Sequence, residues 1–280
     1  MNRVRRSRTL SRGLTLIELC AALCAVAILL TFLLPVMAQN RAQDMAMESN
    51  KQLRGIHQAC VMYAQTNNSW FPGIRGRGEL VPADDIVSAD VDGGVPAGRY
   101  ALLLRGNFFT PGYIVGPFER NKTVWRFGDG DLTDEHFSYA MLALDLDEDG
   151  QVDGPMKDGE PVRRPGTDRR LCYNRTEEWA ETLNTLAPVI SDRNLGEDVN
   201  RGARSIQSSG EPGSWIGGVV YNDNHVVHQL GQRVESKFGR AHGFDGKATS
   251  LDNLFAEDSE MAKDDAVMVF QDAASGVRQR

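Results

Sequence analysis

A long, almost wholly apolar segment near the start of the chain constrains its folding more than any other feature. Residues 14 to 38 read LTLIELCAALCAVAILLTFLLPVMA. As a helix rising about 1.5 Å per residue, this segment is long enough to cross a hydrocarbon core of about 30 Å. Five arginines and no acidic residue precede it, whereas Asp44 and Glu48 follow it. The positive-inside rule therefore predicts a single-pass helix with its N-terminus in the cytoplasm and the remaining chain outside.

One acidic residue, Glu18, interrupts the apolar segment near its start. An ionised carboxylate costs about 2.5–3.5 kcal/mol near the centre of a bilayer. The cost is lower close to the helix start, where the helix dipole partly offsets it. A positive charge supplied by another copy would neutralise Glu18 and also fix the stagger between neighbouring helices. The pattern therefore indicates a helix that assembles with others.

The stretch from Gly13 to Leu19, GLTLIEL, resembles the processing motif of the type IV prepilin and type II secretion pseudopilin superfamily. The resemblance implies that a prepilin peptidase cuts between Gly13 and Leu14 and that the new N-terminal residue is methylated. Glu18 then becomes the fifth mature residue, which is the family's glutamate position. Pro35 matches a position where many members carry a helix-kinking proline. Leu14 departs from the phenylalanine with which the family usually begins its mature chain.

Segments further along resemble the heads of a large bacterial branch of the same superfamily, which end in a hairpin containing histidine and aspartate. They are Leu53 to Tyr63 with Phe71-Pro72, Phe137 to Met141, Ser191 to Asn194, and Trp215 to Val226. That branch provides no catalytic activity to carry over, so the resemblance implies a structural protein and not an enzyme. The implied partners are other pilin-like subunits, prepilin peptidase, an inner-membrane assembly platform and membrane lipid. The implied location is the bacterial inner membrane, and then the assembled filament.

Three alternatives to this interpretation stay open. The basic start followed by Val36-Met37-Ala38 is also typical of a secretory signal peptide, which would release a chain beginning at Gln39. Against this, apolar residues continue at helical spacing through 53 to 64, with no helix breaker between residues 39 and 65. In the second alternative, the chain is a membrane-anchored or secreted calcium-dependent binding module that does not polymerise. In the third, it is a secreted hydrolase. No nucleophile, phosphate-loop or zinc-protease motif supports the hydrolase.

The expected fold class is α+β, with a long N-terminal helix packed on an antiparallel sheet. Four regions are expected: a leader over 1–13, a membrane or filament-core helix over 14–38, its soluble continuation over 39–66, and an extracytoplasmic head over 67–280. The helix is predicted to run over 14–65 with a bend at Pro35. Further predicted elements are helices at 99–105 and 175–186, strands at 136–144 and 187–191, a hairpin formed by 215–221 and 225–230, and an edge strand at 266–270.

An acidic loop between residues 145 and 153 is the best candidate for a metal site. Asp145, Asp147, Asp149 and Asp153 occupy positions 1, 3, 5 and 9 of an EF-hand-like calcium loop, with Gly150 at position 6. Position 12 is a methionine instead of the usual bidentate acid. Calcium binding and a solvated acidic loop are both open. The segment from Asn222 to His228 is interpreted as a hairpin turn, because residues three apart on a strand face opposite ways.

The positions of the cysteines bear on a possible disulfide, and the net charge of the chain bears on nucleic-acid binding. Cys20 and Cys24 lie inside the apolar segment, whereas Cys60 and Cys172 lie beyond it. In an oxidising compartment Cys60 and Cys172 could form one disulfide, and both the bridged and the unbridged state are open. Outside the first 13 residues the chain has 26 basic and 38 acidic side chains. Such an acidic chain is not expected to bind nucleic acid, which requires clustered cations.

Overall fold

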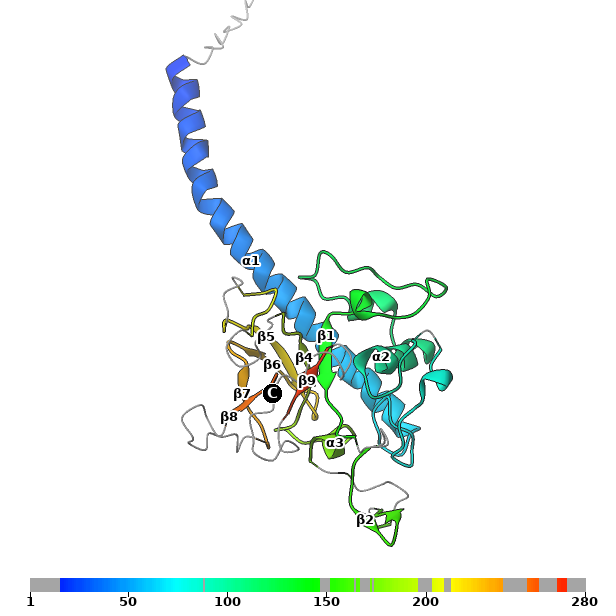
Figure 1. Ribbon diagram of the computed structural model, residues 1–280. Coiled ribbons are helices and arrows are strands. Elements are labelled where there is room, and N and C mark those ends of the chain that lie inside the picture. The colour runs from blue at the N-terminus through cyan, green and yellow to red at the C-terminus, as the bar shows by residue number, and fades with distance from the viewer. Residues whose placement is uncertain are drawn as a thin grey trace, which may run out of the picture. The chain divides into compact units, whose positions relative to one another are not determined.

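The computed structural model describes residues 16–87, 89–146, 152–163, 165–166, 172, 174–195, 203–208, 213–238, 251–256 and 266–270. It combines α-helices with an antiparallel sheet, as the sequence predicts (Figure 1). The chain divides into two compact units, residues 1–44 and residues 45–280, which are described separately.

Helix α1 covers Leu16–Gln65 and continues through Pro35 without a break in its secondary structure. The side chains of residues 32–40 lie outside the description. The helix ends where the sequence predicts, because Asn68 and Ser69 adopt left-handed conformations with φ of 51° and 66°. Asn67 then fixes the following turn by donating to the carbonyl oxygens of Trp70 and Ile74 at 3.1 and 2.6 Å.

The main sheet of the second unit has five strands in the order β6-β5-β4-β1-β9, all paired antiparallel. The bounds are β1 Tyr139–Leu142, β4 Pro188–Asp192, β5 Gly217–Tyr221, β6 Val226–Gln229 and β9 Met268–Val269. Residues of β1 and β5 are buried on both faces of the sheet. Central strands covered on both faces read as continuous apolar runs, which is why these two have little alternation.

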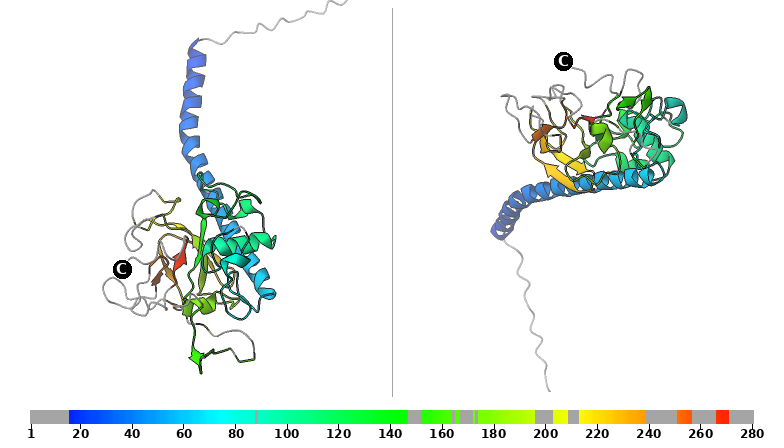
Figure 2. Two further views of the ribbon diagram at one scale, coloured as in Figure 1. Left: turned by 45° about the vertical axis from the view of Figure 1, so that its right-hand side comes forward. Right: turned by 90° about the horizontal axis from the view of Figure 1, so that it is seen from below.

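Residues of α1 beyond Met45 pack against one face of this sheet (Figure 2). Leu53, Ile56 and Cys60 recur on the buried side of the helix, each fully shielded from solvent. Close approach depends on Gly218 of β5, since a Cβ built there would lie 2.5 Å from Leu53 Cδ1. Helix α1 and β5 therefore form the centre of the core.

The remaining elements of the second unit are shorter. Helix α2 spans Pro96–Arg105, and the short 3₁₀ helices are η1 Ala83–Asp85, η2 Pro111–Ile114 and η3 Asp134–His136. Helix α3 spans Asn174–Glu178, so it is shorter than the predicted 175–186. Two small hairpins complete the unit: β2 Met156–Lys157 with β3 Glu160–Pro161, and β7 Arg233–Glu235 with β8 Leu251–Asn253.

Candidate functional site

The first part of α1 exposes apolar side chains around its whole circumference. All side chains from Leu16 to Thr31 are exposed, including Leu16 at 81%, Leu23 at 61% and Ile28 at 59%. A helix that is apolar on every side is typical of a segment covered by lipid or by other helices. This part of α1 is therefore the leading candidate for a contact surface.

Glu18 is the acidic residue in the first turn of this helix. The N-terminal end of a helix dipole favours a carboxylate at that position. The proposed processing residues Gly13 and Leu14 lie outside the described residues, and so does the side chain of Pro35. Within the described part of the chain, no helix combines the length and the apolarity that membrane crossing requires.

Asp192, at the end of β4, forms the main polar joint between α1 and the sheet. Its carboxylate accepts hydrogen bonds from Ser49 Oγ at 3.1 Å, Gln207 Nε2 at 2.8 Å and the backbone N–H of Gly218 at 2.7 Å. Burial raises the pKa of Asp192 to about 6, although these three donors oppose the shift. The Asp192 carboxylate therefore takes up a proton when the pH falls below about 6.

Two further polar pairs surround Asp192. The Tyr139 hydroxyl accepts from Ser49 Oγ at 3.2 Å and donates to Gln52 Oε1, so β1 is also tied to α1. Arg193 binds Glu119 through two hydrogen bonds of 2.6 and 3.0 Å. The hydrogen bonds of this cluster join α1 to β1, β4 and β5, which is the pattern of a structural joint.

His57 is buried between α1 and the turn that joins β5 to β6. Its side chain is 1% exposed, and its ring meets the edge of Phe71 at a centroid distance of 5.5 Å. Burial lowers the pKa of His57 to about 4, and proximity to Asn224 and Asp223 only partly offsets this effect. Among the described residues, neither ring nitrogen has a hydrogen-bond partner. His57 is therefore a neutral core residue at pH 7.

The predicted hairpin turn is confirmed, with β5 and β6 paired from Gly217–Gln229 to Val220–Val226. Asp223 stabilises the turn by accepting from His225 through both the backbone N–H at 3.2 Å and the ring Nδ1 at 2.5 Å. Asn224 adopts φ of 68°, a left-handed conformation that asparagine tolerates. The residue types reflect turn geometry.

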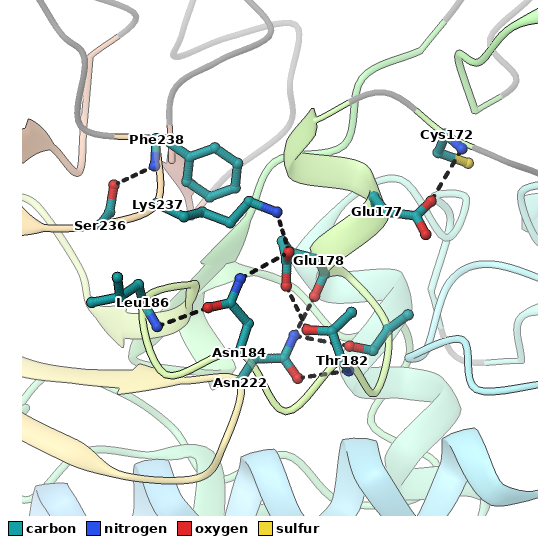
Figure 3. A network of polar contacts seen from close by, with 11 residues as sticks. Cys172, Glu177, Glu178, Thr182, Asn184, Leu186, Asn222, Ser236, Lys237 and Phe238 are labelled. Atoms are coloured by element: carbon teal, nitrogen blue, oxygen red, sulfur yellow. Dashed lines mark hydrogen bonds and ion pairs between the residues drawn. The ribbon is translucent and has the colours of Figure 1, made fainter.

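Glu178, at the end of α3, lies in a buried polar network (Figure 3). Its carboxylate accepts hydrogen bonds from Thr182 Oγ1 at 2.5 Å and Asn184 Nδ2 at 3.1 Å, and it forms an ion pair with Lys237. Asn222 joins the same network by donating to the carbonyl oxygens of Glu178 and Ala180 at 2.6 and 2.8 Å. The network thus fastens the hairpin turn to α3 and to the segment after β7.

Arg99 of α2 is a second buried polar hub, with no exposed surface. Its guanidinium donates to the carbonyl oxygens of Gly93 at 3.0 Å, Gly94 at 2.5 Å and Leu142 at 2.7 Å. The guanidinium carbon also lies 4.5 Å above the ring of Trp179. Burial lowers the pKa of Arg99 to about 9, which still leaves the group charged at pH 7.

The acidic loop gives a different role to the first of its predicted calcium ligands. Asp145 is buried and its Oδ1 lies 2.7 Å from Arg175 Nη2, an ion pair in which both side chains are almost inaccessible. Asp147 and Asp149 lie outside the described residues, and Asp153 donates its backbone N–H to Asp145 O at 2.9 Å. In the part of the chain that the structure describes, no group of acidic, histidine or cysteine side chains has the arrangement of a metal site. Calcium binding stays a prediction, with Asp145 committed to Arg175.

Cys60 and Cys172 are both buried, and each is present as an unbridged thiol, so the disulfide between them stays a prediction. Cys60 lies on the inner face of α1, where burial raises its pKa to about 12. Cys172 lies next to α3, and its backbone N–H donates to Glu177 Oε2 at 3.1 Å. The Cys60 thiol therefore remains protonated at neutral pH and packs as a small apolar side chain.

A cavity of about 440 Å³ opens on the surface between the start of α2 and the segment before β1. Aspartates line its rim, at positions 90, 131 and 134, and Val95, Leu132 and Phe137 lie among the residues beneath them. This cavity joins residues far apart in sequence, so no local pattern predicts it.

No family model, curated protein or solved structure matches this chain.

Proposed function

We propose that this chain is the precursor of a pilin-like subunit for a type IV pilus-like or type II secretion pseudopilus-like filament. The single observation that carries the proposal is Glu18 in the first turn of a helix whose other side chains there are exposed and mostly apolar. Neither water nor lipid is a favourable surrounding for both kinds of side chain at once. A bundle of identical or related helices satisfies both, because it covers the apolar surface and can supply a cation to the carboxylate.

The proposed processing supplies that cation. Cleavage between Gly13 and Leu14 creates a new terminal amine, and the amine of one subunit pairs with Glu18 of its neighbour. Ala21, Ala22 and Cys24 allow the helices to approach closely. Before assembly, the apolar segment 14–38 holds the subunit in the bacterial inner membrane, with residues 45–280 on the extracytoplasmic side.

A structural role suits the polar chemistry of the second unit. Asp192, Glu178 and Arg99 each hold neighbouring elements together through hydrogen bonds between 2.5 and 3.1 Å. Burial lowers the pKa of His57 to about 4, which makes its neutral imidazole a weak base, and raises the pKa of Cys60 to about 12, which keeps the thiol protonated. In this proposal, residues 45–280 form a rigid unit that is displayed on the filament.

Replacement of Glu18 tests the proposal. In cells that express the assembly machinery, Glu18→Ala is expected to leave leader cleavage largely intact while filament content falls about tenfold or more. The reason is that an unpaired terminal amine would remain within the apolar helix bundle. Glu48→Ala is the matched control, because Glu48 is an exposed acid on the same helix and its carboxylate lies 3.4 Å from the Nζ of the exposed Lys51.

Two measurements read out this experiment: the mass of the mature chain and the amount of subunit in sheared filaments. Normal filament content in Glu18→Ala would contradict the proposed role. A cleaved subunit that never gives a helix-to-helix crosslinking ladder, in the parent as well, would favour an anchored module that does not polymerise.

A further inference from the structure

A loop beside the acid-rimmed cavity exposes an aromatic and a cationic side chain next to each other. This Phe127 loop, residues 124–130, exposes 64% of Phe127 and 46% of Val124. A Cβ built at Gly128 or Gly130 would meet nothing within 4 Å, so the end of the loop projects into open space. Exposed aromatic residues adjacent to arginine are typical of the dominant contacts in protein interfaces.

Trp125 anchors the Phe127 loop so that its tip is held in one place. The Trp125 ring is buried, and its Nε1 donates to the carbonyl oxygen of Gly130 at 3.0 Å. Arg126 and Asp129 close the turn through two hydrogen bonds of 3.0 Å. Phe127 meets the edge of Trp125 at 4.7 Å and does not line the cavity of its own chain. A fixed projection of this kind loses little conformational entropy on binding.

Arg126 of the loop carries a charge opposite to that of Asp90 and Asp131 at the cavity rim. Among the described residues, these groups do not pair with each other within one chain. Arg126 and Asp131 are five residues apart, yet among the described residues neither forms an ion pair, and Asp90 forms none either. Lys122 and Arg193 lie over the ring of Phe270, which lines the cavity, and both are already engaged: Lys122 donates to the carbonyl oxygen of Asp134, and Arg193 binds Glu119. Asp90 and Asp131 are therefore open to a cation from outside.

We propose that this face is an interface between two copies of the chain, in which the Phe127 loop of each copy occupies the acid-rimmed cavity of the other. Phe127 enters the apolar base near Leu132 and Phe137, and Arg126 pairs with Asp131. A patch that carries both a projection and the matching cavity is self-complementary, as a twofold interface requires. The cavity volume of about 440 Å³ is ample for an aromatic side chain and lies in the range of ordinary binding pockets. This inference goes beyond the proposed function and does not depend on it.

Charge exchange between copies tests the interface. Full-length chains with two different affinity tags are mixed in detergent, and the amount of the second tag retained with the first is measured. Arg126→Glu or Asp131→Arg in both copies is expected to lower the retention about tenfold, because each change creates like-charge contacts. Mixing an Arg126→Glu copy with an Asp131→Arg copy is expected to restore it, since both contacts then join opposite charges.

Two further variants complete the test. Phe127→Ala is expected to lower retention to a similar extent, whereas Arg77→Glu, an exposed arginine that does not line the cavity, is expected to leave it unchanged. All variants share the same apolar helix, so helix pairing contributes equally to each. Equal retention in every variant, or failure of the mixed pair to recover, would overturn the proposed interface. Neither result bears on cleavage at Leu14 or on Glu18.

Discussion

His57 and Asp192 are buried titratable side chains whose ionisation responds to pH in opposite directions. The pKa of His57 is lowered from 6.5 to about 4, so the folded state binds its proton less readily than the unfolded state. The pKa of Asp192 is raised from 3.8 to about 6, so the folded state binds its proton more readily. As the pH falls below about 6.5, the His57 term therefore destabilises the fold, and the Asp192 term stabilises it.

Single replacements are expected to separate these two opposing terms. Between pH 7 and pH 4.5, the parent should lose about 2 kcal/mol of unfolding free energy relative to His57→Leu, because only the parent must keep a buried imidazole neutral. Over the same interval the parent should gain about 2 kcal/mol relative to Asp192→Asn. Denaturant titrations at the two pH values measure both differences. Differences that do not vary with pH would show that neither residue titrates as described.

At the scale of secondary-structure elements, the fit between α1 and β5 depends on the absence of a side chain at one strand position. A Cβ at Gly218 would lie 2.4 Å from Asn50 Oδ1 and 2.5 Å from Leu53 Cδ1. Gly231 offers a comparison, since a Cβ there would meet nothing within 4 Å. Gly218→Ala is expected to lower the unfolding free energy by about 2 kcal/mol, because the buried Leu53 side chain and the Asn50 side chain must shift out of their packed positions.

Thermal unfolding of the two alanine variants checks this expectation. Gly231→Ala should unfold within about 0.5 kcal/mol of the parent, as is usual for surface changes. An equal effect of both substitutions would mean that the helix and the sheet are not packed as closely as the distances indicate.

Elements with a strong local pattern were predictable from the sequence, and those held by distant contacts were not. The end of α1, the β5–β6 hairpin, β1 and β4 follow from helical spacing, turn residues and apolar runs, and they are confirmed. Helix α3 is shorter than predicted because the residues after Glu178 serve the buried network, and Leu183 adopts φ of 57°. The hairpins β2–β3 and β7–β8 were missed, although Asp158-Gly159 is a turn signal in the first.

The candidate sites divide in the same way. The proposed processing motif and Glu18 occupy one short stretch, so their prediction needs only the local sequence pattern. The acid-rimmed cavity, by contrast, unites Asp90 with Asp131, and the buried role of Arg99 depends on carbonyl oxygens more than 40 residues away as well as nearby. The calcium site at residues 145–153 stays a prediction, and the pairing of Asp145 with Arg175 is a contact that its sequence pattern does not indicate.

At the scale of the whole molecule, the N-terminal end of the chain is basic and the remaining chain is acidic. Residues 1–13 carry five arginines and no acid, whereas the remaining chain has 26 basic and 38 acidic side chains. This asymmetry on either side of the apolar segment favours retention of the basic end in the cytoplasm. Removal of the basic end would leave an acidic chain that begins with the apolar helix and Glu18, which is the form that the proposed filament requires.

The mass and N-terminal sequence of the protein isolated from its native membranes test this central claim most directly. The proposal predicts a chain that begins at Leu14, with the five arginines removed and the apolar segment retained. A chain that keeps residues 1–13, or one that begins at Gln39 after loss of the apolar segment, would contradict it.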